Sequence, residues 1–247
     1  MTESSEAVID AAEPRAVAAI HEGDHAALRR LLAAHPALAT AMLTGADGTG
    51  RTLLHVATDW PGHFPGVGAT IAVLVEAGAD VDARFVGPHT ETPLHWAAST
   101  DDVEALDALL DAGADREADG AVIAGGTPLD DAVAFAQWRT ARRLVERGAH
   151  TGLFNAAALG LVDVVRDHLA AGPPPDQVDD AFWAACHGGQ RQTAELLFRQ
   201  GGAINRPAPW DGLTPLDAAR RHDFYDLAAW LTVRGALSAA DLPIAGG

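Results

Sequence analysis

A short motif that recurs at a fixed distance from a glycine constrains the fold of this chain more than any other feature. The motif reads Thr-Pro-Leu followed by His or Asp, and Gly-Ala follows 21 residues after its threonine. With weaker variants included, about seven copies begin along the chain, at Pro14, Thr52, Thr92, Thr127, Thr151, Asp180 and Thr214. Repeats of this length predict units that stack on one another, because one unit cannot bury its apolar face alone.

Each copy has the residues of a helix pair. A threonine hydroxyl can cap the first amides of a helix, and proline suits the first helical position, where no donor is needed. Small residues such as Ala97 and Ala98 let this first helix pack closely on its neighbours. Paired apolar residues such as Leu109-Leu110 follow in a second helix, and Gly113 supplies a left-handed helix end. The pattern predicts an all-α chain.

The motif Thr92-Pro93-Leu94-His95 with its terminal Gly113-Ala114-Asp115 resembles the ankyrin repeat, and the resemblance covers roughly residues 12 to 236. It implies a solenoid of about seven helix pairs joined by protruding finger loops, with a concave face made by the fingers and first helices. The family mostly binds protein partners. We therefore expect a flexible N-terminus over 1–11, a single ankyrin-repeat domain over 12–236 and a C-terminal tail over 237–247.

The copies are irregular in length. Only two residues separate Gly148 from the next copy at Thr151, so a finger is missing there, and we expect a notch in the concave face. The second copy carries an insert, residues 59–66, that contains Trp60, His63 and Phe64. These side chains could reach the concave face, or they could pack on the neighbouring repeat as a local cap.

Composition narrows the partners. The chain has 34 acidic residues against 17 arginines, no lysine and a net charge of −17, so nucleic acid is an improbable partner. Basic proteins and cationic or apolar small ligands remain open. The bias toward alanine and arginine is typical of a GC-rich, bacterial-like genome. No signal peptide or apolar run of membrane-spanning length is visible, so we expect a cytoplasmic protein without membrane association.

The eighth and ninth positions from the threonine face the concave groove in the ankyrin geometry, and finger tips add to them. These residues, with neighbouring tryptophans, give an aromatic groove that also contains histidines and carboxylates. The candidate binding residues are Asp59, Trp60, His63, Phe85, His89, Glu91, Trp96, Ser99, Phe135, Trp138, His187 and Trp210. An aromatic surface of this kind suits a protein-binding hot spot or a small-molecule pocket.

Other residues fit the scaffold. We expect His55 and His95 to connect neighbouring turns by hydrogen bonds, and Trp183 and Cys186 to be buried. A single cysteine excludes an internal disulfide.

His63, His89 and His187 occupy no structural position of the repeat, and a histidine near a carboxylate could act as a general base. The sequence nevertheless assigns no catalytic residue, metal or cofactor. The leading hypothesis is an interaction module that binds a partner protein in an aromatic concave groove. The alternative is a small-molecule-binding protein or enzyme, such as an isomerase, cyclase or hydrolase, that uses the notch. Of the two, a binding protein is favoured over an enzyme.

Overall fold

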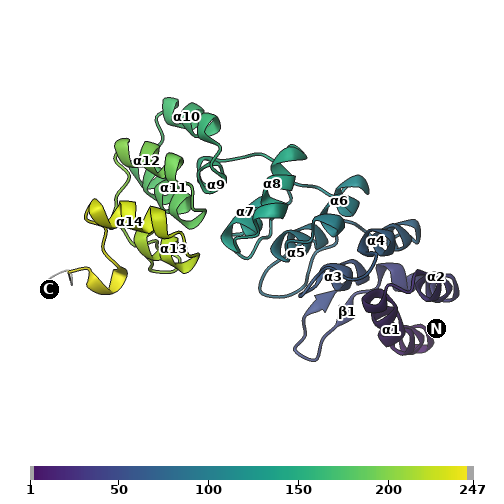
Figure 1. Cartoon of the computed structure of the whole chain (residues 1–247). Coiled ribbons are helices and arrows are strands. Elements are labelled where there is room, and N and C mark those ends of the chain that lie inside the picture. The colour runs from purple at the N-terminus through teal and green to yellow at the C-terminus, as the bar shows by residue number, and fades with distance from the viewer. Residues whose placement is uncertain (1–2, 244–247) are drawn as a thin grey trace. The chain divides into compact units, whose positions relative to one another are not determined.

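The chain is almost wholly helical in the computed structural model, which describes residues 3–243 (Figure 1). Fourteen α-helices lie in that range, and they form seven consecutive pairs. The pairs are α1 (Glu3–Glu22) with α2 (His25–Ala34), α3 (Leu53–Thr58) with α4 (Val67–Glu76), α5 (Pro93–Ser99) with α6 (Val103–Asp111), α7 (Pro128–Ala134) with α8 (Trp138–Glu146), α9 (Leu153–Leu159) with α10 (Val162–Ala170), α11 (Pro175–His187) with α12 (Arg191–Arg199), and α13 (Pro215–Arg221) with α14 (Tyr225–Val233). The predicted all-α solenoid is confirmed.

The chain divides into two compact units. Unit 1 ends at Ala149 and contains α1 to α8, and unit 2 starts at His150 and contains α9 to α14. The boundary falls at the connection where the sequence lacks a finger. The boundary between the units falls within the range expected to be one domain, and helix α1 begins at Glu3, within the segment expected to be flexible. The domain boundaries drawn from the sequence stay a prediction.

The remaining elements of unit 1 are small. A 3₁₀ turn, Pro36–Thr40, precedes a two-stranded antiparallel hairpin of β1 (Leu43–Thr44) and β2 (Gly50–Arg51). This hairpin is the finger before α3, and Gly50 exchanges two backbone hydrogen bonds with Val86 of the next finger. Neighbouring fingers are therefore joined through their backbones. Unit 2 ends with a second 3₁₀ turn, Ala239–Asp241.

The first helices begin as the motif predicts. Helices α5, α7 and α13 have proline at their first position, directly after a threonine N-cap. The fourth motif residue closes a capping box with that threonine, as His95 does with Thr92 and Asp130 does with Thr127. These bonds satisfy amides that the first turn of a helix leaves without partners.

The motif histidines also connect one copy to the next, as predicted. In His95, Nδ1 accepts the Thr92 backbone N–H at 3.1 Å, and Nε2 lies 3.4 Å from the carbonyl oxygen of Gly126 in the following finger. His55 repeats the arrangement with Thr52 and the carbonyl of Glu91. Since Nδ1 is an acceptor, the hydrogen lies on Nε2 and is donated to the carbonyl. Both rings are fully buried.

Two helix starts differ from the sequence prediction. Pro14 lies inside α1, whereas the first copy was expected to begin near it. The sixth copy was expected to begin near Asp180, but α11 starts five residues earlier at Pro175, with Pro174 as its N-cap. The proline run 173–175 therefore includes the first residue of α11, where a residue without an N–H leaves no donor unpaired.

The insert at residues 59–66 packs on both neighbouring copies. The Phe64 ring stacks on His21 with the ring centroids 4.5 Å apart, and the backbone N–H of His63 donates to Asp102 at 2.6 Å. The carbonyl of Gly66 lies 3.1 Å from His25 Nε2. The local cap is therefore the correct reading for His63 and Phe64, while Trp60 remains exposed.

Within residues 3–243 no helix has the length and apolar character needed to cross a membrane.

Replacing His95 with alanine should lower the free energy of unfolding by about 2–4 kcal/mol, because it removes two buried hydrogen bonds and leaves a cavity. Urea denaturation followed by circular dichroism measures this loss. As a control, Asp167→Asn changes an exposed side chain of α10 and should leave the free energy of unfolding unchanged. A loss of equal size in both variants would contradict the structural role of His95.

The cost of His95→Ala should shrink in acid. Burial lowers the pKa of His95 from 6.5 to about 4. The neutral ring therefore favours the folded state above pH 6.5, and that contribution is lost as the pH falls toward 4. The same denaturation at about pH 5 and about pH 7.5 should show the smaller difference between variant and wild type at the lower pH. A larger difference at the lower pH would contradict the assignment of a neutral ring.

Candidate functional site

Unit 1 has an open pocket that is built from three consecutive copies. Its volume is about 400 Å³. The second copy supplies the end of α3 and the residues that follow it, the third supplies α5 and the residue before its cap, and the fourth supplies its finger and the end of α7. The lining residues are Thr58, Asp59, Trp60, Glu91, Trp96, Ser99, Thr100, Val122, Phe135 and Gln137.

Six of the twelve candidate binding residues meet around this pocket: Asp59, Trp60, Glu91, Trp96, Ser99 and Phe135. The positions of Asp59, Trp60, Ser99 and Phe135 follow from the repeat, because the eighth and ninth positions, with the motif threonine counted as the first, lie where a first helix ends. That any of them binds a ligand stays a prediction.

Aromatic side chains form the pocket walls at different depths. Trp96 on α5 is half-buried, and it packs against Phe85 with ring centroids 5.3 Å apart and edge-on against His55 at 4.9 Å. Trp60 and Phe135 stand at the rim with 76% and 44% of their surface exposed. Phe85 lines no part of the pocket but supports Trp96 from outside it. The pocket therefore has a fixed aromatic floor and two exposed aromatic edges.

Two carboxylates line the pocket, of which one is ion-paired and the other is buried. Asp59 forms an ion pair with Arg51. Glu91 is buried, and this burial raises the pKa of its carboxyl above the usual value, while His89 and a hydrogen bond from the Trp96 indole act in the opposite direction. In the described part of the chain no arginine forms an ion pair with Glu91. Among the described residues, His89 is therefore the cationic group that acts on a negative charge at Glu91.

Asp131 is a further buried acid that the sequence analysis missed. It lies on α7, and none of its surface is exposed. Burial, together with the nearby charge of Glu91, raises its pKa from 3.8 to about 7, although the backbone N–H groups of Val122 and Ile123 lower it. Neither carboxylate oxygen forms a hydrogen bond of standard geometry. Its position was the available signal, because Asp131 occupies in the fourth copy the place of Trp96 in the third.

The candidate histidines do not converge. His63 lies in the insert, where its Nδ1 is 3.9 Å from Asp102, and His89 lies in the finger before α5. Neither lines the pocket, and His187 belongs to unit 2. Trp138, at the start of α8, is also outside the lining. The geometry that we expected of an enzyme, with histidines facing carboxylates in a closed pocket, is not present in the described residues of unit 1.

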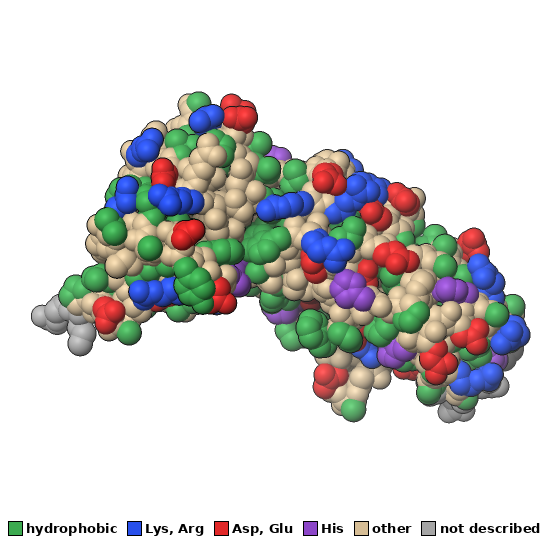
Figure 2. Space-filling model, viewed as in Figure 1, with side chains coloured by type: hydrophobic (Ala, Val, Ile, Leu, Met, Phe, Trp, Pro, Cys, Tyr) green, Lys and Arg blue, Asp and Glu red, His purple; other side chains and the backbone are tan. Residues whose placement is uncertain are grey.

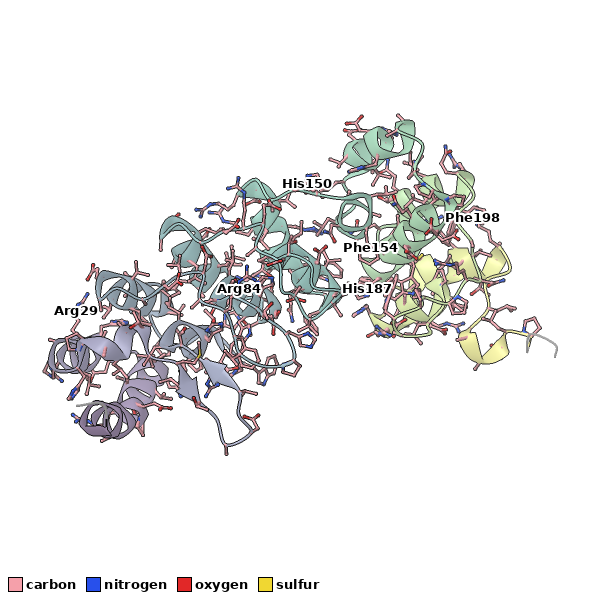
Figure 3. All side chains as sticks on the ribbon, turned by 180° about the vertical axis from the view of Figure 1, so that it is seen from behind. Arg29, Arg84, His150, Phe154, His187 and Phe198 are labelled. Carbon is pink, nitrogen blue, oxygen red and sulfur yellow. The ribbon has the colours of Figure 1, made fainter. Side chains whose placement is uncertain are left out.

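Unit 2 contains a separate aromatic cluster on α9, α11 and the last finger. Trp183 is buried, as predicted, and its indole N–H donates to the Leu213 carbonyl at 3.0 Å. The half-exposed ring of Trp210 lies edge-on to Trp183 and Phe154, with centroids 5.0 and 5.7 Å away. Figure 3 labels Phe154 and His187, which come from α9 and α11. Trp210 and His187, both candidate binding residues, thus belong to this cluster.

A histidine pair extends the cluster. The His187 ring is buried and stacks on Trp183, and its Nδ1 lies 3.2 Å from His222 Nε2. Burial, followed by the charge of Arg221, lowers the pKa of His222. His187 was expected to be free of structural contacts, and this expectation was wrong, because the ring is enclosed at the end of α11.

The charges of the surface are mixed. Figure 2 shows Asp and Glu side chains spread over the visible face of each unit, with arginines between them. Many of these arginines pair with acids, as Arg143 and Arg147 do with Asp107. Among residues 3–243, no group of three or more His, Cys, Asp or Glu side chains is arranged to hold a metal ion. Cys186 is buried, as predicted, and this burial raises the pKa of its thiol.

Comparison with known proteins finds one matching repeat and a similar fold. Residues 89–120 match the family model for the ankyrin repeat. The crystal structure of the human ASB11 ankyrin repeat domain matches the fold with a TM-score of 0.53 and 23% sequence identity, over 93% of this chain and 99% of that domain. No curated protein sequence matches the chain. The matched repeat contains the motif at Thr92, and its helix-pair architecture recurs along the described residues. Residues 89–120 thus form an ankyrin repeat, and the described chain has the fold of an ankyrin-repeat domain.

Proposed function

We propose that this chain is a binding module that holds a partner protein on the concave side of unit 1, at the pocket of Trp60, Trp96 and Phe135. The observation that carries the proposal is the exposure of Trp60 and Phe135 beside the half-buried Trp96. Large aromatic side chains that are fixed by packing and still reach solvent are typical of interface hot spots, since they bury much area at little cost in conformational entropy.

The shape of the pocket favours a protein over a small molecule. A pocket of about 400 Å³ is within the range of small-ligand sites, but those sites usually enclose most of the ligand. Here the pocket is open, and Trp60 lines it with 76% of its surface exposed. An open groove with a local hollow suits an extended partner that places one side chain in the pocket.

Peptide selection on the full chain tests the proposal. A displayed library of random peptides is selected on the wild type, and each enriched peptide is titrated against Trp60→Ala and Phe135→Ala. We expect each variant to weaken binding about tenfold or more, which is the size of a hot-spot loss. Fluorescence polarisation of labelled peptides measures the dissociation constants.

The matched control is Tyr225→Ala, which removes an aromatic residue of α14 that is 70% exposed and lies in unit 2. Peptides should bind this variant as tightly as the wild type. If the enriched peptides bind all three variants with wild-type affinity, the groove of unit 1 is not the binding surface.

A further inference from the structure

Two buried acids lie at the unit 1 pocket, and neither has an arginine partner. Glu91 lines the pocket at 7% exposure, and Asp131, which has no exposed surface, is close enough for the charge of Glu91 to raise its pKa. Asp59, in the same pocket, has Arg51 as its partner. Neither Glu91 nor Asp131 forms an ion pair with an arginine anywhere in the described ranges. Glu91 and Asp131 therefore lack the arginine partner that Asp59 has.

Asp131 gives an independent sign that the site is incomplete. A buried carboxylate normally accepts several hydrogen bonds, yet both of its oxygens lack one of standard geometry. Leaving a buried acid uncompensated costs stability, and proteins keep such costs mainly where function requires them. A positive charge brought in from outside would remove the cost.

The walls of the pocket favour the same kind of ligand. The faces of aromatic rings attract cations, and tryptophan attracts them most strongly. Trp96 and Trp60 both line the space beside Glu91. A cation in this pocket would thus meet two indole rings and a carboxylate. The net charge of −17 would also attract a basic partner over a longer range.

We propose that the pocket binds an arginine side chain of the partner, with the guanidinium stacked against the aromatic walls and hydrogen-bonded to the carboxylate of Glu91. A guanidinium is planar, so it can lie flat on an indole while its edge donates two parallel bonds to a carboxylate. An ammonium group cannot do both at once. Asp131 acts near Glu91, as a positioning residue that adds negative charge to the site.

This inference rests on the proposed function, and it is tested with a small probe that does not depend on peptide selection. Agmatine, which has the guanidinium group of arginine on a short chain, is titrated into the isotopically labelled full chain at about pH 8. Butylurea serves as a neutral analogue and tetramethylammonium as a cation without donors. The indole N–H signals of Trp60 and Trp96 report binding by nuclear magnetic resonance, and each is assigned with its Trp→Phe variant.

Agmatine should shift both indole signals with saturation, and butylurea should leave them in place. Glu91→Gln keeps the shape of the side chain but removes its charge, and it should weaken agmatine about tenfold. The control Asp167→Asn removes an equal charge from an exposed position of α10 and should change nothing. Thermal unfolding of each variant verifies that it is folded.

Two results would overturn the arginine assignment. One is agmatine that shifts neither indole signal, and the other is tetramethylammonium that binds more tightly than agmatine. In both cases peptides that still require Trp60 would leave the groove as the binding surface. Conversely, peptides that bind Trp60→Ala as tightly as the wild type would overturn the proposed function, whatever the result of the agmatine titration.

Asp131→Asn should stabilise the free chain more at about pH 8 than at about pH 5. The pKa of Asp131 is raised from 3.8 to about 7, so keeping this acid buried costs little below pH 3.8, and the cost grows with pH until it is complete above about 7. Urea denaturation at both pH values measures the gain, and agmatine affinity should fall in the same variant at the higher pH. An equal gain at both pH values would contradict an ionised Asp131 in the free chain.

Discussion

The hydrogen bonds of the fourth motif residue are the interaction on which the rest of this solenoid depends. His95 closes the first turn of its own helix through Thr92 and reaches the carbonyl of Gly126 in the following finger. One side chain therefore sets both the start of a helix and its distance to the next copy. Where aspartate replaces histidine, as in Asp217, one carboxylate oxygen caps Thr214 and also accepts the N–H of Ala239 beyond the last helix. Two different chemical groups thus make the same kind of connection.

The pocket of unit 1 differs from this regular scaffold in how its acidic side chains are compensated. Burial of Glu91 and Asp131 raises both pKa values, and the two groups oppose each other's ionisation. The scaffold supports this cost because the surrounding helices are well packed, with Leu94, Ala97 and Leu129 fully buried. Aromatic rings at the rim add apolar surface that water covers poorly. In the described structure of unit 1, the buried acids of the pocket thus lack arginine partners and its aromatic rim is exposed. A ligand could supply a positive charge and cover the aromatic surface.

Sequence reasoning predicted the regular parts well. Helix starts at Thr-Pro, helix ends at glycine and the bonds of His55 and His95 all follow from local chemistry, so they could be read from the motif. Six pocket residues were predicted because the repeat fixes which positions face the groove. The features that the sequence did not predict depend on tertiary contacts. Nothing local distinguishes a proline inside α1 from one at a helix start, or shows that His187 is enclosed by Trp183 and His222. The burial of Asp131 was not predicted, because a carboxylate next to Asp130 resembles an ordinary acid of a first helical turn. Its burial depends on the adjacent finger.

The pocket is also a property of the stack and of no single repeat. Its walls come from α3, α5 and α7, which are six, seven and seven residues long. Helices so short do not persist alone in water, where a stable helix needs about 12–15 residues or more. Each wall is therefore held in place by the copies on either side of it. A fragment that kept every lining residue but lost the outer copies would have the right side chains without a surface to arrange them. The pocket therefore requires a minimum number of stacked copies, because the copies stabilise one another.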